Sequence, residues 1–465
     1  MVHHPSNALG SASPVARPSL VLVNPWIYDF AAYDLWAKPL GLLHLAALLR
    51  QSGYRIRFLD CLDVHHPGLD ALNGKRPARR PYGTGKFWRE RTSRPAPLKE
   101  IRRSYSRYGI PTQLLREDLR KIQAPGAILV TSLMTYWYPG VQEVIRLCRE
   151  VHPDAPVILG GTYARLCAEH ALRFSGADHV VFGCGEDAAR SVWGILQGYG
   201  VSPDFEEPLP TSPPAPALDL IPVLEYAPVL TSTGCPYRCP YCASHYLYPR
   251  FERRDPDEVW HEILFWSEER GVRDFVFYDD ALLVDFDSHA ALILERAAGK
   301  GLRFHTPNAI HVREIRPSVA GLLFRAGFRT IRLGLETVDR RLHHRMGNKV
   351  SEGEFSKAAS SLRAAGFTKK DIGAYVLAGL PGQSVESVKE TILFADECGV
   401  TPYLAEYTPM PHTPLWEEAV SSSAYDLRGE PLYHNNTLLP CWSGEERDRM
   451  RELRELLRSI RRKGL

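Results

Sequence analysis

The chain has 465 residues, of which 44% are hydrophobic and 24% charged, and a formal net charge of +3. This length exceeds one ordinary domain, and the composition is typical of globular proteins rather than disordered or fibrous ones. No run of about 18 apolar residues is present, so we expect no membrane-spanning helix. Residues 1–17 lack the apolar core of a signal peptide. We therefore expect them to form a disordered tail on a cytoplasmic protein.

Short β-branched segments alternate with helical patterns in the first 200 residues. This alternation predicts a Rossmann-like, doubly wound parallel sheet over residues 18–200. The predicted strands are Ser19–Asn24, Tyr54–Asp60, Ala127–Ser132, Pro156–Gly160 and His179–Phe182. The predicted helices are Leu40–Gln51, Gly140–Val151, Ala164–Phe174 and Glu186–Gln197.

A basic segment interrupts the alternation, and we interpret residues 66–117 as an insertion rather than as part of the core. Between Lys75 and Arg107 the chain carries twelve Lys and Arg residues against only Glu90 and Glu100. Such a block either faces phosphates or an acidic partner, or it is a solvated loop. The sequence leaves both readings open.

A proline-rich linker over residues 201–221 separates this region from a second series of strands and helices. The predicted strands are Pro228–Thr233, Asp274–Tyr278, Arg303–Thr306, Thr330–Leu335, Gly373–Ala378 and Tyr403–Tyr407. The predicted helices are Pro256–Arg270, Ser288–Lys300, Ser318–Ala326, Ser351–Ala365 and Ser384–Cys398. Six repeats are fewer than the eight of a closed barrel, so we predict a partial (β/α)6 barrel of the TIM type over residues 222–416. A C-terminal extension, residues 417–465, contains a predicted amphipathic helix at Glu445–Lys463.

Three of the nine cysteines, Cys235, Cys239 and Cys242, are spaced C-x3-C-x2-C directly after the first barrel strand. The other six are scattered, as buried free thiols are. Three thiolates on one loop can each bind a different iron of a cluster and leave a fourth iron open, whereas four-cysteine sites fill every position. The alternative is zinc, which needs four closed ligands. His245 is the one candidate nearby for a fourth ligand.

With Tyr241 at its aromatic position, this loop resembles the signature of radical S-adenosylmethionine (SAM) enzymes, C-x3-C-x-aromatic-C. The resemblance implies a [4Fe–4S] cluster on the three cysteines, SAM on the open iron and an external one-electron donor such as flavodoxin or ferredoxin. It also implies SAM contacts from residues at the ends of successive strands, namely Tyr241, Asp279, Asp280, Asn308, Glu336, Gly379, Gly382 and Tyr407. His305 is a further candidate for contact with SAM or substrate. The residues from Tyr407 to Thr413 are similar to the family's Y-S-P-x-P-G-T, with His412 in place of glycine. Because of this replacement, the resemblance does not define the backbone conformation at His412.

The first domain resembles the cobalamin-binding domain found upstream of one class of radical SAM enzymes. The resemblance implies cobalamin contacts at the carboxyl ends of its strands, from Asn24, Pro25, Trp26, Ser132, Thr135, Gly160, Gly161, Gly183 and Glu186. Residues 63–68 spell D-x-H-x-x-G, a cobalt-ligating motif in some cobalamin proteins, but here the motif follows the second strand rather than the first. We therefore expect that His65 does not bind cobalt.

Together the resemblances imply a cobalamin-dependent methyltransferase. Reductive cleavage of SAM would give a 5′-deoxyadenosyl radical that abstracts hydrogen from an unactivated carbon, and methylcobalamin would then deliver the methyl group. We expect the substrate pocket between the two domains. The alternatives are a cyclase or rearrangement enzyme of the same class without methyl transfer, a methylthiolating enzyme, and a cluster-bearing sensor that binds nucleic acid through Lys75–Arg107. The sequence does not identify the substrate.

Overall fold

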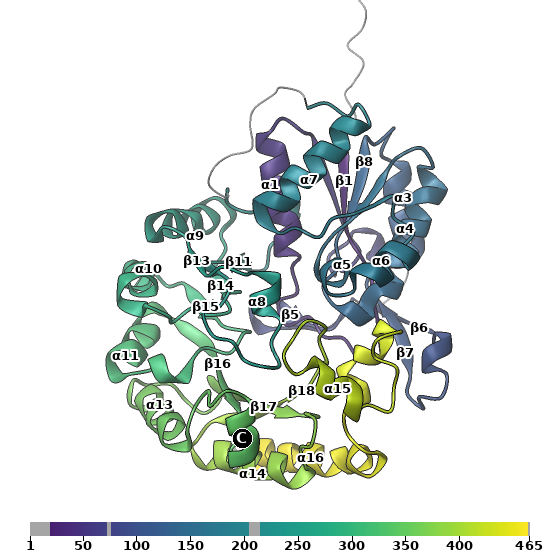
Figure 1. The fold of residues 1–465 in the computed structure, drawn as a ribbon. Coiled ribbons are helices and arrows are strands. Elements are labelled where there is room, and N and C mark those ends of the chain that lie inside the picture. The colour runs from purple at the N-terminus through teal and green to yellow at the C-terminus, as the bar shows by residue number, and fades with distance from the viewer. Residues whose placement is uncertain (1–18, 72–75, 204–213, 464–465) are drawn as a thin grey trace, which may run out of the picture.

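A computed structural model describes residues 19–71, 76–203 and 214–463. Within these ranges the chain forms two parallel sheets, each covered by helices and joined at a common seam (Figure 1). No helix in the described ranges is long and apolar enough to cross a membrane. The predicted N-terminal tail and most of the proline-rich linker lie outside the described residues.

The N-terminal sheet has the strand order β10-β9-β8-β1-β3, and all of its pairings are parallel. Its strands are β1 (Leu20–Asn24), β3 (Ile56–Asp60), β8 (Ala127–Val130), β9 (Val157–Leu159) and β10 (His179–Val180). Successive residues of β1 point to opposite faces, as in any strand. Leu20 and Leu22 therefore pack beneath one layer of helices, and Val21 and Val23 beneath the other. This sheet confirms the predicted Rossmann-like, doubly wound fold.

Two layers of helices cover this sheet. The first layer contains α1 (Leu40–Gln51) and α7 (Gly185–Gly198). The second contains α3 (Thr112–Arg120), α4 (Tyr138–Val151), α5 (Thr162–Leu166) and α6 (Ala168–Phe174). The single helix predicted over Ala164–Phe174 is thus broken, because Cys167 has non-helical backbone angles.

The basic segment is folded and partly buried, which corrects its interpretation as an insertion outside the core. Strand β7 (Tyr105–Tyr108) pairs with both β2 (Ile27–Asp29) and β6 (Arg89–Thr92) in an antiparallel sheet. Tyr105 and Leu98 are 2% and 0% exposed, inside the hydrophobic core of the N-terminal domain. The remaining short elements of residues 66–98 are α2 (Gly68–Ala71), β4 (Arg79–Arg80), η1 (Pro81–Gly83), β5 (Thr84–Gly85) and η2 (Ala96–Leu98).

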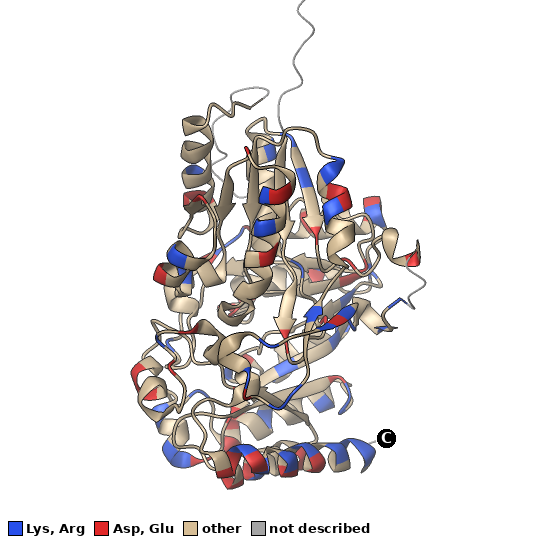
Figure 2. Cartoon of the chain, turned by 90° about the vertical axis from the view of Figure 1, so that its right-hand side faces the viewer, with Lys and Arg blue, Asp and Glu red and all other residues tan. Residues whose placement is uncertain are grey.

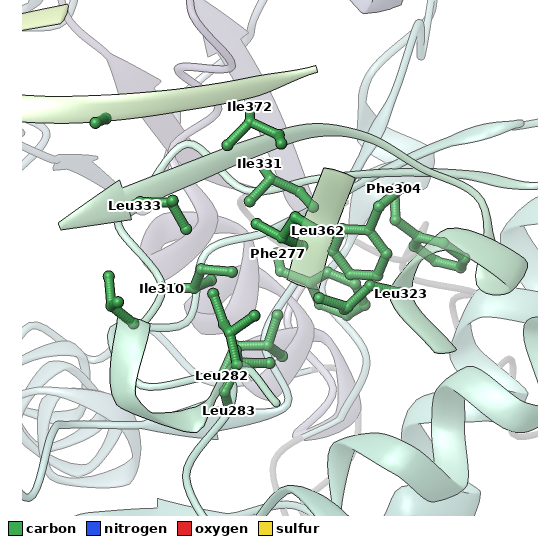
Figure 3. Close-up of a cluster of buried hydrophobic side chains, with 14 of the residues drawn as sticks. Phe277, Leu282, Leu283, Phe304, Ile310, Leu323, Ile331, Leu333, Leu362 and Ile372 are labelled. Atoms are coloured by element: carbon green, nitrogen blue, oxygen red, sulfur yellow. The ribbon is translucent and has the colours of Figure 1, made fainter. Parts of the chain in front are cut away.

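The second sheet confirms the predicted partial (β/α)6 barrel, with the parallel strand order β11-β14-β15-β16-β17-β18. Its strands are β11 (Ala227–Val229), β14 (Asp274–Phe277), β15 (Arg303–His305), β16 (Phe328–Glu336), β17 (Ile372–Ala378) and β18 (Thr401–Glu406). The covering helices are α9 (Pro256–Arg270), α10 (Ala290–Ala297), α11 (Pro317–Ala326), α13 (Glu352–Ala364) and α14 (Val385–Glu397). Outward-facing strand residues such as Phe277, Phe304 and Ile331 interdigitate with helix residues such as Leu323 and Leu362 (Figure 3).

Two aromatic residues of the N-terminal domain pack against residues of the barrel. Trp36 and Tyr82 both adopt left-handed backbone angles, with φ of 62° and 65°. Their rings lie 5.0 and 4.6 Å from the ring of His305 on β15. The Trp36 indole donates to the Tyr82 carbonyl, and the hydroxyl of Tyr278 donates to the Trp36 carbonyl. We call this pair the aromatic wedge; it contributes N-terminal side chains to the core of the barrel domain.

The C-terminal extension contacts both domains. Helix α16 (Gly444–Lys463) packs along α14, and its Met450, Leu453 and Leu457 join the barrel core. Its outer face carries interspersed acidic and basic residues, at the end marked C in Figure 2. Between α15 (Trp416–Ser422) and α16, residues 430–439, which we call the C-terminal strap, reach the N-terminal domain. Their contacts include hydrogen bonds between Tyr138 and Glu430, His434 and Thr135, and Asn435 and Asp29.

Candidate active site between the two parallel sheets

The three clustered cysteines lie on a tight loop, residues 234–242, at the carboxyl end of the barrel. The predicted first barrel strand is split, and the loop follows its second piece, β12 (Ser232–Thr233), which pairs with β13 (Glu252–Arg253). Gly234 has a φ of +74°, and a Cβ there would lie 2.3 Å from the Arg250 carbonyl oxygen. Only glycine therefore fits the sharp exit from the strand. The loop leads into α8 (Ser244–Leu247).

The three thiols fit the donor set of an iron–sulfur cluster. Burial raises the pKa of the Cys242 thiol to about 11, against the hydrogen bond from the Ser244 amide, which lowers it. Burial also raises the pKa of Cys235. Binding of iron must therefore displace protons from these thiols. Among the described residues no three His, Cys, Asp or Glu side chains are gathered to hold a single metal ion. The donor set of three thiols on one loop suits a cluster in which each thiolate binds a different iron.

Two neighbouring aspartates at the end of β14 hold the cysteine loop in different ways. The buried Asp279 carboxylate accepts hydrogen bonds from the amides and hydroxyls of Thr231 and Ser232, at 2.7–3.1 Å. It therefore fixes the strand from which the loop departs. Asp280 accepts a hydrogen bond from the Ser244 hydroxyl, and its charge acts on the Cys235 and Cys242 thiols. The predicted SAM contacts of both aspartates stay predictions.

A buried ion pair lies on the other side of the cysteine loop. Glu336 ends β16 with a φ of +64°, after an irregularity in the register with β17. Its carboxylate lies 2.5 Å from the Lys349 ammonium, and the Tyr241 hydroxyl lies 3.5 Å from the same nitrogen. Burial lowers the pKa of Lys349, but Glu336 and Cys239 outweigh this effect, so the pKa is raised and the ammonium stays charged. No motif pointed to Lys349, which follows the short helix α12 (Arg340–Arg345).

The glycine turn after β17 lies beside an unsatisfied tyrosine. Gly379 and Gly382 have φ of +99° and +68°. The buried Gln383 amide holds the turn by accepting from the amides of Gly379 and Leu380 and donating to the Leu377 carbonyl. A Cβ on Gly379 would lie 3.8 Å from Tyr407. The Tyr407 hydroxyl is buried and has no hydrogen-bond partner in the described part of the chain. This free donor fits the predicted contact with SAM.

Two candidates have structural roles in the barrel. His305 is 0% exposed and bonds Thr330 and Asp274, so it is a core residue, and its predicted contact with SAM or substrate is wrong. The Asn308 amide donates to the carbonyls of Tyr278 and Asp279, which places it at the carboxyl end of β14.

His412 adopts the left-handed backbone expected of the glycine it replaces, with a φ of +67°. Its ring stacks on Tyr246 at 4.1 Å.

The carboxyl end of the N-terminal sheet presents a cradle made mainly of backbone. The Ser132 hydroxyl donates to the Gly160 carbonyl and accepts from the Tyr163 amide. A Cβ on Gly161 would lie 2.4 Å from the Ser132 carbonyl oxygen, whereas a Cβ on Gly160 would meet only one atom, at 3.9 Å. The space beside Gly160 is therefore open to a bound group. We call Ser132, Gly160 and Gly161 the glycine cradle; it fits the predicted approach of a flat cofactor.

The other predicted cobalamin contacts divide into two groups. The carbonyl oxygen of the Asn24 side chain is buried without a partner among the described residues, although its amide donates to Asp60. Pro25 and Trp26 are buried, and the Trp26 indole donates to the Ile110 carbonyl. This corrects the prediction for the Trp26 side chain, which belongs to the core.

The remaining predicted cobalamin contacts, Thr135, Gly183 and Glu186, each have close contacts within the protein. Thr135 bonds His434 of the C-terminal strap, and Glu186 pairs with Arg190 on α7. Gly183 makes the close turn into α7, where a Cβ would lie 2.9 Å from the Ala188 nitrogen. His65 lies 3.1 Å from Glu225, next to the barrel, away from the glycine cradle.

The carboxyl ends of both sheets meet at the seam between the domains. Arg165 on α5, after β9, donates to the carbonyl of Tyr246, just after the cysteine loop. Burial raises the pKa of Tyr136, which follows β8, and the hydroxyl of Thr408 after β18 opposes this shift. On the barrel side, an open cavity of about 510 Å³ is lined by residues of the barrel and the C-terminal extension, among them His245, His412, Trp416, Glu417 and Arg428. The predicted interdomain location of the site therefore agrees with the contacts across the seam.

Comparison with known proteins identifies both halves. Residues 229–395 match the model of the radical SAM superfamily, and residues 111–192 match the B12-binding domain. The uncharacterized methyltransferase PH0819 of Pyrococcus horikoshii is 24% identical over 68% of this chain and 74% of its own length. The cytidylyl-2-hydroxyethylphosphonate methyltransferase of Streptomyces wedmorensis is 21% identical over 92% and 87% of the two chains.

A solved structure has the same fold. The radical SAM methyltransferase TsrM from Kitasatospora setae, with cobalamin and a [4Fe–4S] cluster bound, superposes with a TM-score of 0.62. It is 16% identical, and the match covers 90% of this chain and 81% of the other. The cofactors of the two matched domains are a [4Fe–4S] cluster with SAM, and cobalamin. The chain therefore carries a B12-binding domain, matched over residues 111–192, ahead of a radical SAM domain, matched over residues 229–395.

Proposed function

We propose that the protein is a cobalamin-dependent radical SAM methyltransferase that methylates an unactivated carbon. The observation that carries this proposal is the contact between the two domains, where Arg165, which follows β9 of the N-terminal sheet, donates to the Tyr246 carbonyl just after the cysteine loop. The relatives named above as methyltransferases support methyl transfer rather than cyclisation or rearrangement. When bound, the cluster, SAM and cobalamin supply an organic radical and a methyl donor to one substrate.

The residues of the chain position these groups and shield them from water. Cys235, Cys239 and Cys242 would hold the cluster. The Tyr407 hydroxyl and the turn at Gly379 would contact SAM, while the Lys349 ammonium pairs with the Glu336 carboxylate beside the cysteine loop. The glycine cradle would let cobalamin approach the backbone closely. The C-terminal strap covers part of the seam and limits access of water.

Reducing electrons would reach the cluster from outside the protein. A small cavity of about 100 Å³, lined by Tyr237, Arg238, Cys239, His311 and Lys349 among others, opens beside the cysteine loop. We propose that a small one-electron donor such as flavodoxin or ferredoxin docks here. The exposed Arg238 would favour an acidic donor.

Anaerobic reconstitution tests the proposal. We expect about four irons and one cobalt per chain, and a change in the electron paramagnetic resonance spectrum of the reduced cluster when SAM is added. With SAM carrying a deuterated methyl group and a reductant, the enzyme should form both 5′-deoxyadenosine and S-adenosylhomocysteine. Formation of 5′-deoxyadenosine alone, with cobalt bound and candidate substrates present, would contradict methyl transfer and favour the cyclase alternative.

A further inference from the structure

The loop between β6 and β7 forms a pocket in which positive charge is concentrated. The pocket has a volume of about 570 Å³ and contains five cations, Arg91, Arg94, Lys99, Arg102 and Arg103. Thr92, Ser93 and Ser104 add hydroxyl groups to the same wall. The described residues that line it include no carboxylate. We call this cavity the basic pocket.

The five cations lack the partners that other cations of the same segment have. Arg76 pairs with Asp70, Arg79 with Asp34 and Glu225, and Arg107 with Glu90. Within the described chain, none of the five forms an ion pair with a carboxylate. Five like charges around one cavity repel one another, so their positive potential is available to an anion from outside.

The backbone at the base of the basic pocket is fixed by packing and hydrogen bonds. Leu98, at the base of its loop, is 0% exposed and packs with Leu432 and Leu438 of the C-terminal strap. The Tyr433 hydroxyl donates to the Pro97 carbonyl, and Arg94 donates to the Arg103 carbonyl. An anion would therefore meet a backbone that is already in place, with Arg94 and Arg103 held by hydrogen bonds to backbone carbonyls.

One side of the basic pocket adjoins the seam between the domains. Arg103 donates to the carbonyl of Thr437 in the C-terminal strap, and its guanidinium lies 5.7 Å from the ring of Phe30. Burial and the nearby Arg454 lower the pKa of Arg103, while Glu406 and Asp29 oppose this effect. Glu406 ends β18, so Arg103 is close to the carboxyl end of the barrel. A ligand held in the pocket can extend from there toward the reaction site.

From this arrangement we propose that the basic pocket binds a phosphoryl or diphosphoryl group carried by the substrate of this enzyme. Arginine forks and hydroxyl donors are the groups that bind phosphate oxygens in proteins, and the volume suits a ligand the size of a diphosphate ester. The five cations are confined to one short segment, residues 91–103, rather than spread along a basic stripe, which favours a small phosphate ester over a polynucleotide. The proposal rests on the proposed function, because it assigns a substrate class to the same reaction.

Binding of inorganic pyrophosphate tests this assignment without any turnover. We expect holoenzyme to bind one pyrophosphate per chain, measured by isothermal titration calorimetry at fixed ionic strength. The variant Lys99→Gln/Arg102→Gln removes two cations whose side chains make no hydrogen bond in the described structure, and it should weaken binding about tenfold. The matched variant Arg325→Gln/Arg329→Gln, which removes two exposed cations on the barrel surface, should leave the affinity unchanged.

The possible results are distinguishable. Absence of pyrophosphate binding, or an equal loss in both variants, overturns the basic pocket as a phosphate site. Tighter binding of a single-stranded 20-nucleotide RNA than of pyrophosphate, lost in Lys99→Gln/Arg102→Gln, replaces the small ester with a nucleic acid. Formation of 5′-deoxyadenosine and S-adenosylhomocysteine, assayed separately, decides the proposed function whichever result is obtained.

Discussion

The two halves of the candidate site offer their cofactors different parts of the chain. At the carboxyl end of the barrel the candidate ligands are side chains, namely three thiols, a buried ion pair and the Tyr407 hydroxyl. At the carboxyl end of the N-terminal sheet they are backbone atoms exposed by glycine, with Ser132 bracing them. This difference teaches that the barrel half depends on the chemistry of its side chains, and the N-terminal half on close approach of the backbone to the cofactor. A mutation in one half should therefore impair cofactor binding in that half alone.

The largest expected effect is confined to the barrel half. Cys239→Ser should lower iron content to background and 5′-deoxyadenosine formation by more than about 100-fold, because the cluster loses one of three protein ligands. Cobalt content should remain near one per chain. Cys398→Ser, which changes a thiol that contacts Ser356 far from the loop, is the control and should keep both metals. Loss of cobalt together with iron would show that the halves are not independent.

The reciprocal change should act on the N-terminal half. Gly161→Ala places a Cβ 2.4 Å from the Ser132 carbonyl at a φ of +92°, so we expect a loss of about 2–4 kcal/mol in the free energy of unfolding and a lower cobalt content. Gly185→Ala has a similar left-handed backbone but open space around it, and should cost about 1 kcal/mol. Chemical denaturation and cobalt analysis measure both effects. Iron content should not change in either variant.

Acid should weaken the seam that joins the halves. Burial lowers the pKa of His434 to about 4, from 6.5 in an unfolded chain. Between these values the unfolded chain binds a proton that the folded chain does not, so stability is lost as pH falls below 6.5. Over the 1.5 pH units down to pH 5 this loss is about 2 kcal/mol. His434→Gln should therefore show a smaller difference in urea midpoint between pH 7 and pH 5, whereas the exposed His261→Gln should match the parent.

The smallest expected effect separates binding from stability in the barrel. Tyr407→Phe removes a hydroxyl that has no partner in the described chain, so the free energy of unfolding should change by less than about 0.5 kcal/mol. The Kd for SAM should rise about three- to tenfold if this hydroxyl contacts SAM. Tyr375→Phe, whose hydroxyl donates to the Pro307 carbonyl, should show the reverse, with lower stability and unchanged SAM affinity. An unchanged Kd for Tyr407→Phe would remove Tyr407 from the SAM site.

Local patterns predicted the barrel and the Rossmann-like sheet well. The helices Leu40–Gln51 and Pro256–Arg270 begin and end where predicted, since a helical periodicity and a left-handed Gly271 after the second one mark them clearly. The cysteine loop was predictable because its spacing lies within eight residues.

The errors arose where distant segments interact. The basic residues of β6 and β7 hid two strands. Strand β7 pairs with Ile27–Asp29, about eighty residues away, and β6 pairs with β7; α3 was missed with them. Trp26 and His305 were predicted to contact ligands because each lies at or near the end of a strand. In the structure the Trp26 indole bonds the Ile110 carbonyl, and His305 bonds Thr330 and Asp274. The place of Lys349 in the site could not be predicted from the sequence. It depends on an ion pair with Glu336, which follows an irregularity in the register of β16.

The aromatic wedge has a consequence for how the protein can be divided. Trp36 and Tyr82 are the only described N-terminal rings that lie against His305, and Tyr226 and Val276 of the barrel share their apolar cluster. A fragment that begins at the barrel would expose these surfaces to water and lose both rings from its core. We therefore expect the radical SAM half to aggregate when produced alone, and to regain solubility when the N-terminal half is co-expressed as a separate chain.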